Sequence, residues 1–153
     1  MNWIRDLITN PFVLTSLSSW FIAQVMKTII YAIINRKQDW ERLFGDGGMP
    51  SGHSATVTSL AVFSGLNFGF GSFQFAATAI LAIVVCHDAM GVRLETGKQA
   101  VALNELLEVF ELIHPNKISE ANLKEFVGPT PIQGMAGILL GIVNACVMHF
   151  WVL

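Results

Sequence analysis

The run FVLTSLSSWFIAQVMKTIIYAII, residues 12–34, decides the fold class of this chain. A helix that crosses a bilayer needs about 20 mostly apolar residues, and this run supplies them although Gln24 and Lys27 interrupt it. Three further apolar runs of comparable length follow along the chain: residues 54–70, 73–89 and 132–152. The sequence therefore predicts an all-α integral membrane bundle with about four transmembrane helices, which form a single transmembrane domain over residues 1–153.

Composition agrees with a membrane protein. Hydrophobic residues make up 53% of the chain and charged residues only 13%, whereas an ordinary soluble domain has roughly a quarter charged residues. Nine Lys and Arg face eleven Asp and Glu, which gives a net charge of −2. This balance excludes a basic surface that could neutralise a nucleic acid backbone, so we expect no nucleic acid partner.

Residues 92–130, between the third and fourth runs, hold much of the charge and must lie outside the bilayer. One set of side chains recurs there at helical spacing: Gln99, Ala102, Leu106, Val109 and Ile113. Another face carries polar side chains: Asn104, Glu108 and Glu111. This spacing predicts an amphipathic helix. A second, shorter helix is predicted from Ser119 to Val127, because Gly128 and Pro129 follow it in the usual order of helix-stop residues.

Four spans would place the loops 35–52 and 91–130 on one side of the membrane and both termini on the other. Most of the Lys and Arg residues lie in these two loops, whereas Arg5 alone lies on the terminal side. By the positive-inside rule, the two loops are predicted to be cytoplasmic and the termini to lie on the opposite side.

The first run carries a stripe of polar and aromatic side chains. They follow one another at spacings of four, three, four and four residues: Trp20, Gln24, Lys27, Tyr31 and Asn35. On a helix they fall within about 100° of one another. Lys27 lies about 10 Å into the bilayer, where an unpaired ammonium group is unfavourable. Either Lys27 binds an anion or pairs with an acidic group, or its side chain snorkels to the interface.

The segment GDGGMPSGH, residues 45–53, leads directly into the second run. Ser51 and Gly52 sit where a helix exposes unpaired N–H groups, and such an end attracts phosphate. His53 is able to give a proton to a leaving oxygen near neutral pH. The alternative is a capped turn that simply enters a membrane helix.

The third run ends in HDAMGVR, residues 87–93, which places His87, Asp88 and Arg93 at the same membrane face. The forked donors of a guanidinium group match a phosphate. The alternative is an Asp88–Arg93 ion pair that closes the helix end.

Small residues mark the helix faces that we expect to pack. The fourth run begins after Pro131, which suits a first helical position, and carries Gly134, Gly137 and Gly141 at a spacing that lets helices approach closely in lipid. The second run has a comparable small face: Ser54, Thr58, Ala61 and Gly65.

Three blocks resemble the divergent family related to type 2 phosphatidic acid phosphatases and vanadium-dependent haloperoxidases. They are GGMPSGHSA (47–55), DAMGVRLETGKQAVALN (88–104) and LKEFVGPTPIQGMAGILLG (123–141), together with Gln24, Lys27 and Arg36. The resemblance covers nearly the whole chain and its order of motifs. With the spacing arguments above, it implies a set of phosphate-binding candidates: Lys27, Arg36, Ser51, Gly52, Arg93 and Lys98. The catalytic candidates are His53, Asp88 and His87.

One element of the superfamily pattern is missing. Its third motif supplies a nucleophilic His, and divergent members usually read Gly-His-Thr-Pro before the last helix. This sequence reads Gly128, Pro129, Thr130, Pro131. Since a proline side chain cannot attack phosphorus, the superfamily mechanism cannot run unchanged, and His87 beside Asp88 is the candidate substitute.

These observations leave three hypotheses. The first is a lipid-phosphate phosphohydrolase that acts on a phosphate monoester or diphosphate at the cytoplasmic membrane face. The second is a non-catalytic lipid-phosphate binder, transporter or membrane complex subunit, and the third is a purely structural subunit. We expect a membrane lipid or lipid phosphate as partner, and four helices that enclose little on their own are compatible with a homo-oligomer.

The sequence gives no reason to expect a cofactor. No recognisable metal-ligand spacing is present, and the resemblance implies phosphatases that work without a metal.

Overall fold

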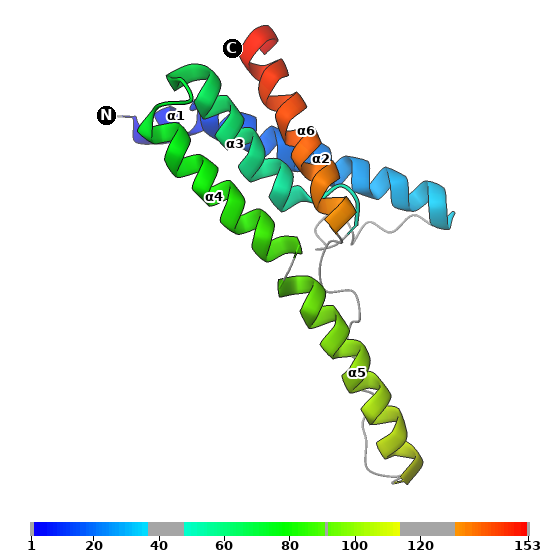
Figure 1. Ribbon diagram of the computed structural model, residues 1–153. Helices are drawn as coiled ribbons and strands as arrows, with labels where there is room; N and C mark the ends of the chain where they lie inside the picture. Colours follow the sequence, from blue (N-terminus) through cyan, green and yellow to red (C-terminus); the bar gives the residue numbers. More distant parts are fainter. Residues whose placement is uncertain (1, 37–47, 91, 114–130, 153) are drawn as a thin grey trace.

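The computed structural model describes residues 2–36, 48–90, 92–113 and 131–152 of the 153-residue chain. Within these ranges every regular element is a helix (Figure 1). The elements are, in chain order, α1 (Trp3–Ile8), α2 (Pro11–Asn35), α3 (Gly52–Phe68), α4 (Phe73–Met90), α5 (Val92–Ile113), α6 (Pro131–Val147) and the π-helical turns η2 (Met148–Val152). The all-α prediction is confirmed.

Three of the helical segments are long and apolar enough to cross a membrane: Pro11–Ile34, Phe73–Met90 and Pro131–Trp151. The membrane-bundle prediction is therefore confirmed in its fold class. The remaining predicted span, 54–70, corresponds to α3, which has 17 residues. At 1.5 Å per residue α3 is about 26 Å long, a little short of a hydrocarbon core of roughly 30 Å. Its crossing of the bilayer stays a prediction.

Helix α3 lies at the centre of the bundle, because it packs against α2, α4 and α6. Most of its buried residues are small: Gly52, Ser54, Ala55, Ser59, Ala61, Ser64 and Gly65. The glycines of α6 face them. A Cβ atom on Gly141 would lie 2.6 Å from the Ala55 carbonyl oxygen, and one on Gly137 would collide with the Ser51 carbonyl oxygen. The small residues thus allow two helix backbones to touch.

A buried polar contact joins α6 to α2. The Asn144 amide nitrogen lies 3.1 Å from the Thr15 carbonyl oxygen, 2.9 Å from Ser18 Oγ and 2.7 Å from Ser19 Oγ, as a donor to these oxygens. A side chain amide in a membrane helix needs partners of this kind, since lipid offers none.

The two ends of the bundle differ. Both termini and the α3–α4 turn lie at one end, whereas α5 projects from the other (Figure 1). We call this other end the motif end. There the Ser51 N–H donates to the Gln133 carbonyl oxygen at 3.0 Å, and the Met90 side chain occupies the space that a Cβ on Gly134 would need. The starts of α3 and α6 and the end of α4 therefore meet.

The predicted amphipathic stretch 99–113 lies within α5, which has α4 as its main neighbour. The helix predicted over 119–127 and Pro129 lie outside the described residues.

Candidate anion site at the start of α3

Helix α3 begins with a capped and buried first turn. Ser51 is the N-cap, with extended backbone angles (φ −69°, ψ 119°), and its Oγ accepts a hydrogen bond of 3.4 Å from the Ser54 N–H. Only 3% of Ser51 is exposed. Further N–H groups of the first turn have no partner within the helix and carry the positive end of its dipole. This turn can therefore offer donors to an anion.

Lys27 reaches from α2 to the segment just before this turn. Its side chain is 5% exposed, and its stem runs along Gly48, where a Cβ atom would lie 2.9 Å from Lys27 Cγ and 3.2 Å from Cδ. Gly48 adopts φ +100°, a conformation that suits glycine. A snorkelling lysine would keep its ammonium group in water, so this burial favours a lysine held within the protein.

Two other members of the α2 stripe, Trp20 and Gln24, also lie at the start of α3. A Cβ on Gly52 would lie 3.3 Å from Trp20 Cδ1 and 3.9 Å from the Gln24 side chain nitrogen. One face of α2 thus covers the segment that leads into α3. We call this junction the α2–α3 site; its residues are Trp20, Gln24 and Lys27 from α2, with Gly48, Ser51 and Gly52 from the α3 start.

The other basic candidates lie elsewhere. Arg36 is the exposed C-cap of α2, with φ 51°, and it follows Lys27 by nine residues, or about 13 Å along a helix axis. Lys98 is exposed on α5. Neither of them belongs to the α2–α3 site, whereas Lys27 lies against Gly48, three residues before the Ser51 N-cap.

The acid–base candidates are exposed. His53 is the second residue of α3 and directly follows Gly52. His87 and Asp88 lie in the last turn of α4, whose buried residues are Cys86 and Ala89. At about 100° per residue, Asp88 points roughly 200° away from Cys86. The structure thus turns Asp88 away from the buried face of α4, while the Arg93 side chain lies outside the described part of the structure.

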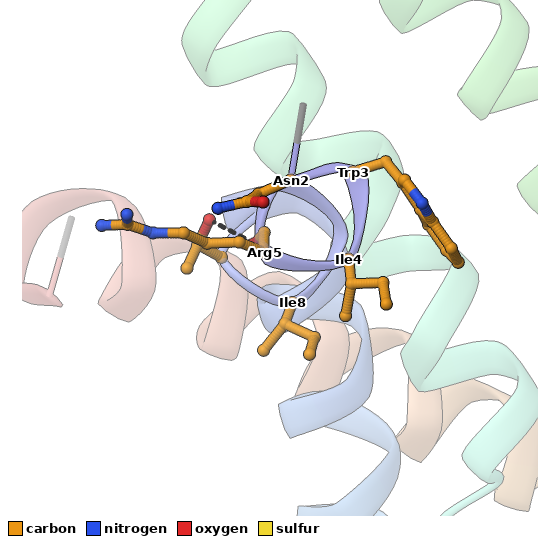
Figure 2. A pocket seen from close by; sticks show the side chains of 6 residues that line it. Asn2, Trp3, Ile4, Arg5 and Ile8 are labelled. Atoms are coloured by element: carbon orange, nitrogen blue, oxygen red, sulfur yellow. Dashed lines mark hydrogen bonds between the residues drawn. The ribbon is translucent and has the colours of Figure 1, made fainter.

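Two further features of the described residues do not contribute to this site. No three His, Cys, Asp or Glu side chains within the described ranges are grouped as metal ligands. A pocket lies instead at α1, far from the motif end, and Figure 2 shows the side chains that line it: Asn2, Trp3, Ile4, Arg5, Ile8 and Thr9. The Thr9 hydroxyl donates to the Arg5 carbonyl oxygen there, at 2.8 Å.

Sequence reasoning gave Gln24 and Trp20 no binding role, although both belong to the stripe. The signal that could have found them was their spacing, which puts them on the same face as Lys27. What the spacing could not give was the partner of that face, which is the start of α3.

Comparison with known proteins gives the family. The model of the Divergent PAP2 family matches residues 8–144. A similar protein is the uncharacterized membrane protein YuiD of Bacillus subtilis (strain 168), which is 39% identical over 92% of this chain and 97% of its own length. No solved structure matches the chain. The chain is a membrane protein that belongs to the Divergent PAP2 family.

Proposed function

We propose that this membrane protein binds the phosphate group of a membrane lipid at the α2–α3 site. The observation that carries the proposal is the burial of Lys27 against Gly48, three residues before the N-cap of an inner helix. A cation and a helix N-terminus in one junction form a pair of anion-binding elements.

The position of the site fits a lipid better than a freely diffusing anion. Helix α2 exposes apolar side chains within two residues of Lys27, including Met26 and Ile29, which are 40% and 52% exposed. These side chains suit acyl chains, so a lipid headgroup would reach the site while its tails stay on the outer face of α2.

The test is binding of short-chain lipid phosphates to the purified protein in detergent, measured by calorimetry. Lys27→Met keeps the apolar stem and removes the charge, and we expect it to weaken binding roughly 10- to 100-fold, since a hydrogen bond to a charged group is worth about 1.5–3 kcal/mol. Arg5→Met removes one charge at the opposite end and serves as the control. Equal affinity of wild type and Lys27→Met would contradict the proposal.

Hydrolysis is the second candidate, and the position of His53 favours it. His53 is exposed on the first turn of α3, one residue beyond Gly52, where a proton donor for a leaving alcohol would be useful. Against it stands Pro129 at the position where the superfamily nucleophile is expected. Binding without turnover therefore agrees better with the sequence.

The two candidates separate in an assay of phosphate release from a panel of lipid phosphates. Release by the wild type that is lost in His53→Ala and kept in His149→Ala, a histidine at the other end of the bundle, would establish an enzyme. His87→Ala then tests the substitute nucleophile, since full activity in that variant removes His87 from consideration. No release, with binding retained, supports the binder. No binding at all would leave the motifs with a purely structural role.

A further inference from the structure

The α2–α3 site contains one group whose chemistry is opposite to that of the rest. Lys27 and the first turn of α3 are hydrogen-bond donors, but the Gln24 side chain presents an oxygen, which only accepts. Gln24 is 6% exposed, and its Oε1 has no hydrogen-bond partner among the described residues. A buried polar atom in this state destabilises the folded protein unless something donates to it.

The location of the Gln24 Oε1 atom indicates which group could donate a hydrogen bond to it. The Gln24 carboxamide lies against Gly52, with its nitrogen 3.9 Å from where a Cβ would be. Gln24 also precedes Lys27 by three residues, so the two side chains are neighbours on one face of α2. An anion held by Lys27 and the α3 start would therefore lie within reach of the carboxamide.

We propose that Gln24 is a ligand-contacting residue whose unpaired oxygen accepts a hydrogen bond from a P–OH group. This inference rests on the proposed function and adds to it a requirement: the bound phosphate must carry a hydroxyl. A singly protonated phosphate monoester meets this requirement, whereas a phosphate diester has the same charge but no donor. Gln24 thus selects monoesters over diesters within a site that otherwise reads only negative charge.

The decisive comparison uses two lipids of equal charge. At pH 5 dioctanoyl phosphatidic acid carries about one negative charge, because the second pKa of a phosphate monoester is about 6. Its methyl ester, dioctanoyl phosphatidylmethanol, also carries one. We expect the wild type to bind the monoester about three- to tenfold more tightly, the range typical of one uncharged hydrogen bond.

Variants assign this preference to Gln24. Gln24→Met keeps the length of the side chain and removes the acceptor, so it should bind both lipids with the affinity that the wild type has for the methyl ester. Gln74→Met, an exposed position in the first turn of α4, is the matched control and should keep the preference. Ligand-free Gln24→Met should also melt at a higher temperature than the wild type, because an unpaired buried acceptor is gone. If Gln24 had a merely structural role, Gln24→Met would keep the preference for the monoester.

The outcomes separate this inference from the function on which it rests. Equal binding of both lipids by the wild type, or an unchanged preference in Gln24→Met, overturns the role of Gln24 and leaves phosphate binding in place. The wild-type comparison decides even if Gln24→Met fails to fold. Binding of neither lipid overturns both proposals. Glycerol 3-phosphate supplies the same chemistry without acyl chains; a Gln24-dependent affinity for it supports the inference with a soluble phosphate as ligand, and dependence seen only with the lipids supports it with a membrane ligand.

Discussion

Gly48 is the residue on which the geometry of the α2–α3 site depends most directly. It adopts φ +100°, and a Cβ atom there would lie 2.9 Å from Lys27 Cγ. Gly48→Ala therefore introduces both backbone strain and a collision with the lysine stem. We expect a loss of about 1–3 kcal/mol in the free energy of unfolding and weaker lipid-phosphate binding, measured by thermal unfolding in detergent and by calorimetry.

The chain offers a matched control for this substitution. Gly71 lies in the α3–α4 turn with nothing within 4 Å of its Cβ position. Gly71→Ala should change the free energy of unfolding by no more than about 0.5 kcal/mol, as is usual for an exposed site. If Gly48→Ala behaved like Gly71→Ala in both measurements, the contact between Gly48 and Lys27 would have no role in the site.

At this scale the sequence predicted which residues share a helix face but not what that face contacts. The spacing of Trp20, Gln24 and Lys27 fixes their common face, because a helix turns by a known angle per residue. The partner of that face depends on how α2 packs on the rest of the bundle. The same limit applies to Asp88: its place at the motif end followed from the end of an apolar run, whereas its exposed side depends on Cys86 and Ala89 facing inward.

At the scale of elements, α6 is fixed to its neighbours by two kinds of contact. Its glycines touch the backbone of α3, and Asn144 bonds to Thr15, Ser18 and Ser19 of α2. The sequence predicted the glycine face as a packing surface, since small residues at four-residue spacing serve that purpose in membranes. It did not predict α3 as the partner, because the pattern carries no information on which neighbour it fits.

The polar contact makes a prediction of its own. Asn144→Leu keeps the branched shape of the side chain and removes its donors, so α6 loses its hydrogen bonds to α2. Hydrogen bonds between membrane helices are worth about 0.6 kcal/mol on average and up to about 1.7 kcal/mol. We therefore expect the free energy of unfolding to fall by about 1–2 kcal/mol, as measured by denaturation in mixed micelles.

Asn67→Leu is the control for this variant. Asn67 is exposed near the end of α3, and among the described residues its amide donates to the Phe63 carbonyl oxygen, within its own helix, at 2.8 Å. It should be close to neutral. An Asn144→Leu protein as stable as Asn67→Leu would mean that the glycine contacts alone hold α6 in place.

The glycine contacts are tested separately by Gly137→Ala. The added methyl group would collide with the Ser51 carbonyl oxygen, so α6 must move away from α3 or the helices must shift. Overpacking of this kind typically lowers the free energy of unfolding by about 1–3 kcal/mol. Because the Ser51 N–H bonds to Gln133 of α6, lipid-phosphate affinity should fall as well. A stable variant with unchanged affinity would show that the start of α3 does not depend on α6.

For the whole molecule, two exposed tryptophans of the described residues lie at the end that carries the termini. Trp3 is 65% exposed and Trp151 is 86% exposed, and tryptophan is enriched where a protein crosses from lipid to water. The short helix α1, with Ile4 and Ile8 also exposed, suits the same boundary. The motif end would then lie at the other boundary, provided that α3 crosses the bilayer with its neighbours.

That condition is open to a direct test, since the 17 residues of α3 are slightly short of a full span and the positive-inside rule depends on the number of crossings. Single cysteines at Met49 and at Gly71, which flank α3 and are both exposed, are introduced after Cys86 and Cys146 are replaced by alanine. If α3 spans and the motif end is cytoplasmic, a membrane-impermeant maleimide should label Gly71→Cys in intact cells and Met49→Cys only after permeabilisation. The reverse labelling would keep the span and reverse the orientation. Labelling of both positions from one side would show that α3 enters the bilayer without crossing it. The α2–α3 site would then be formed by a re-entrant helix, whose N–H donors are held in place by α2 and α6.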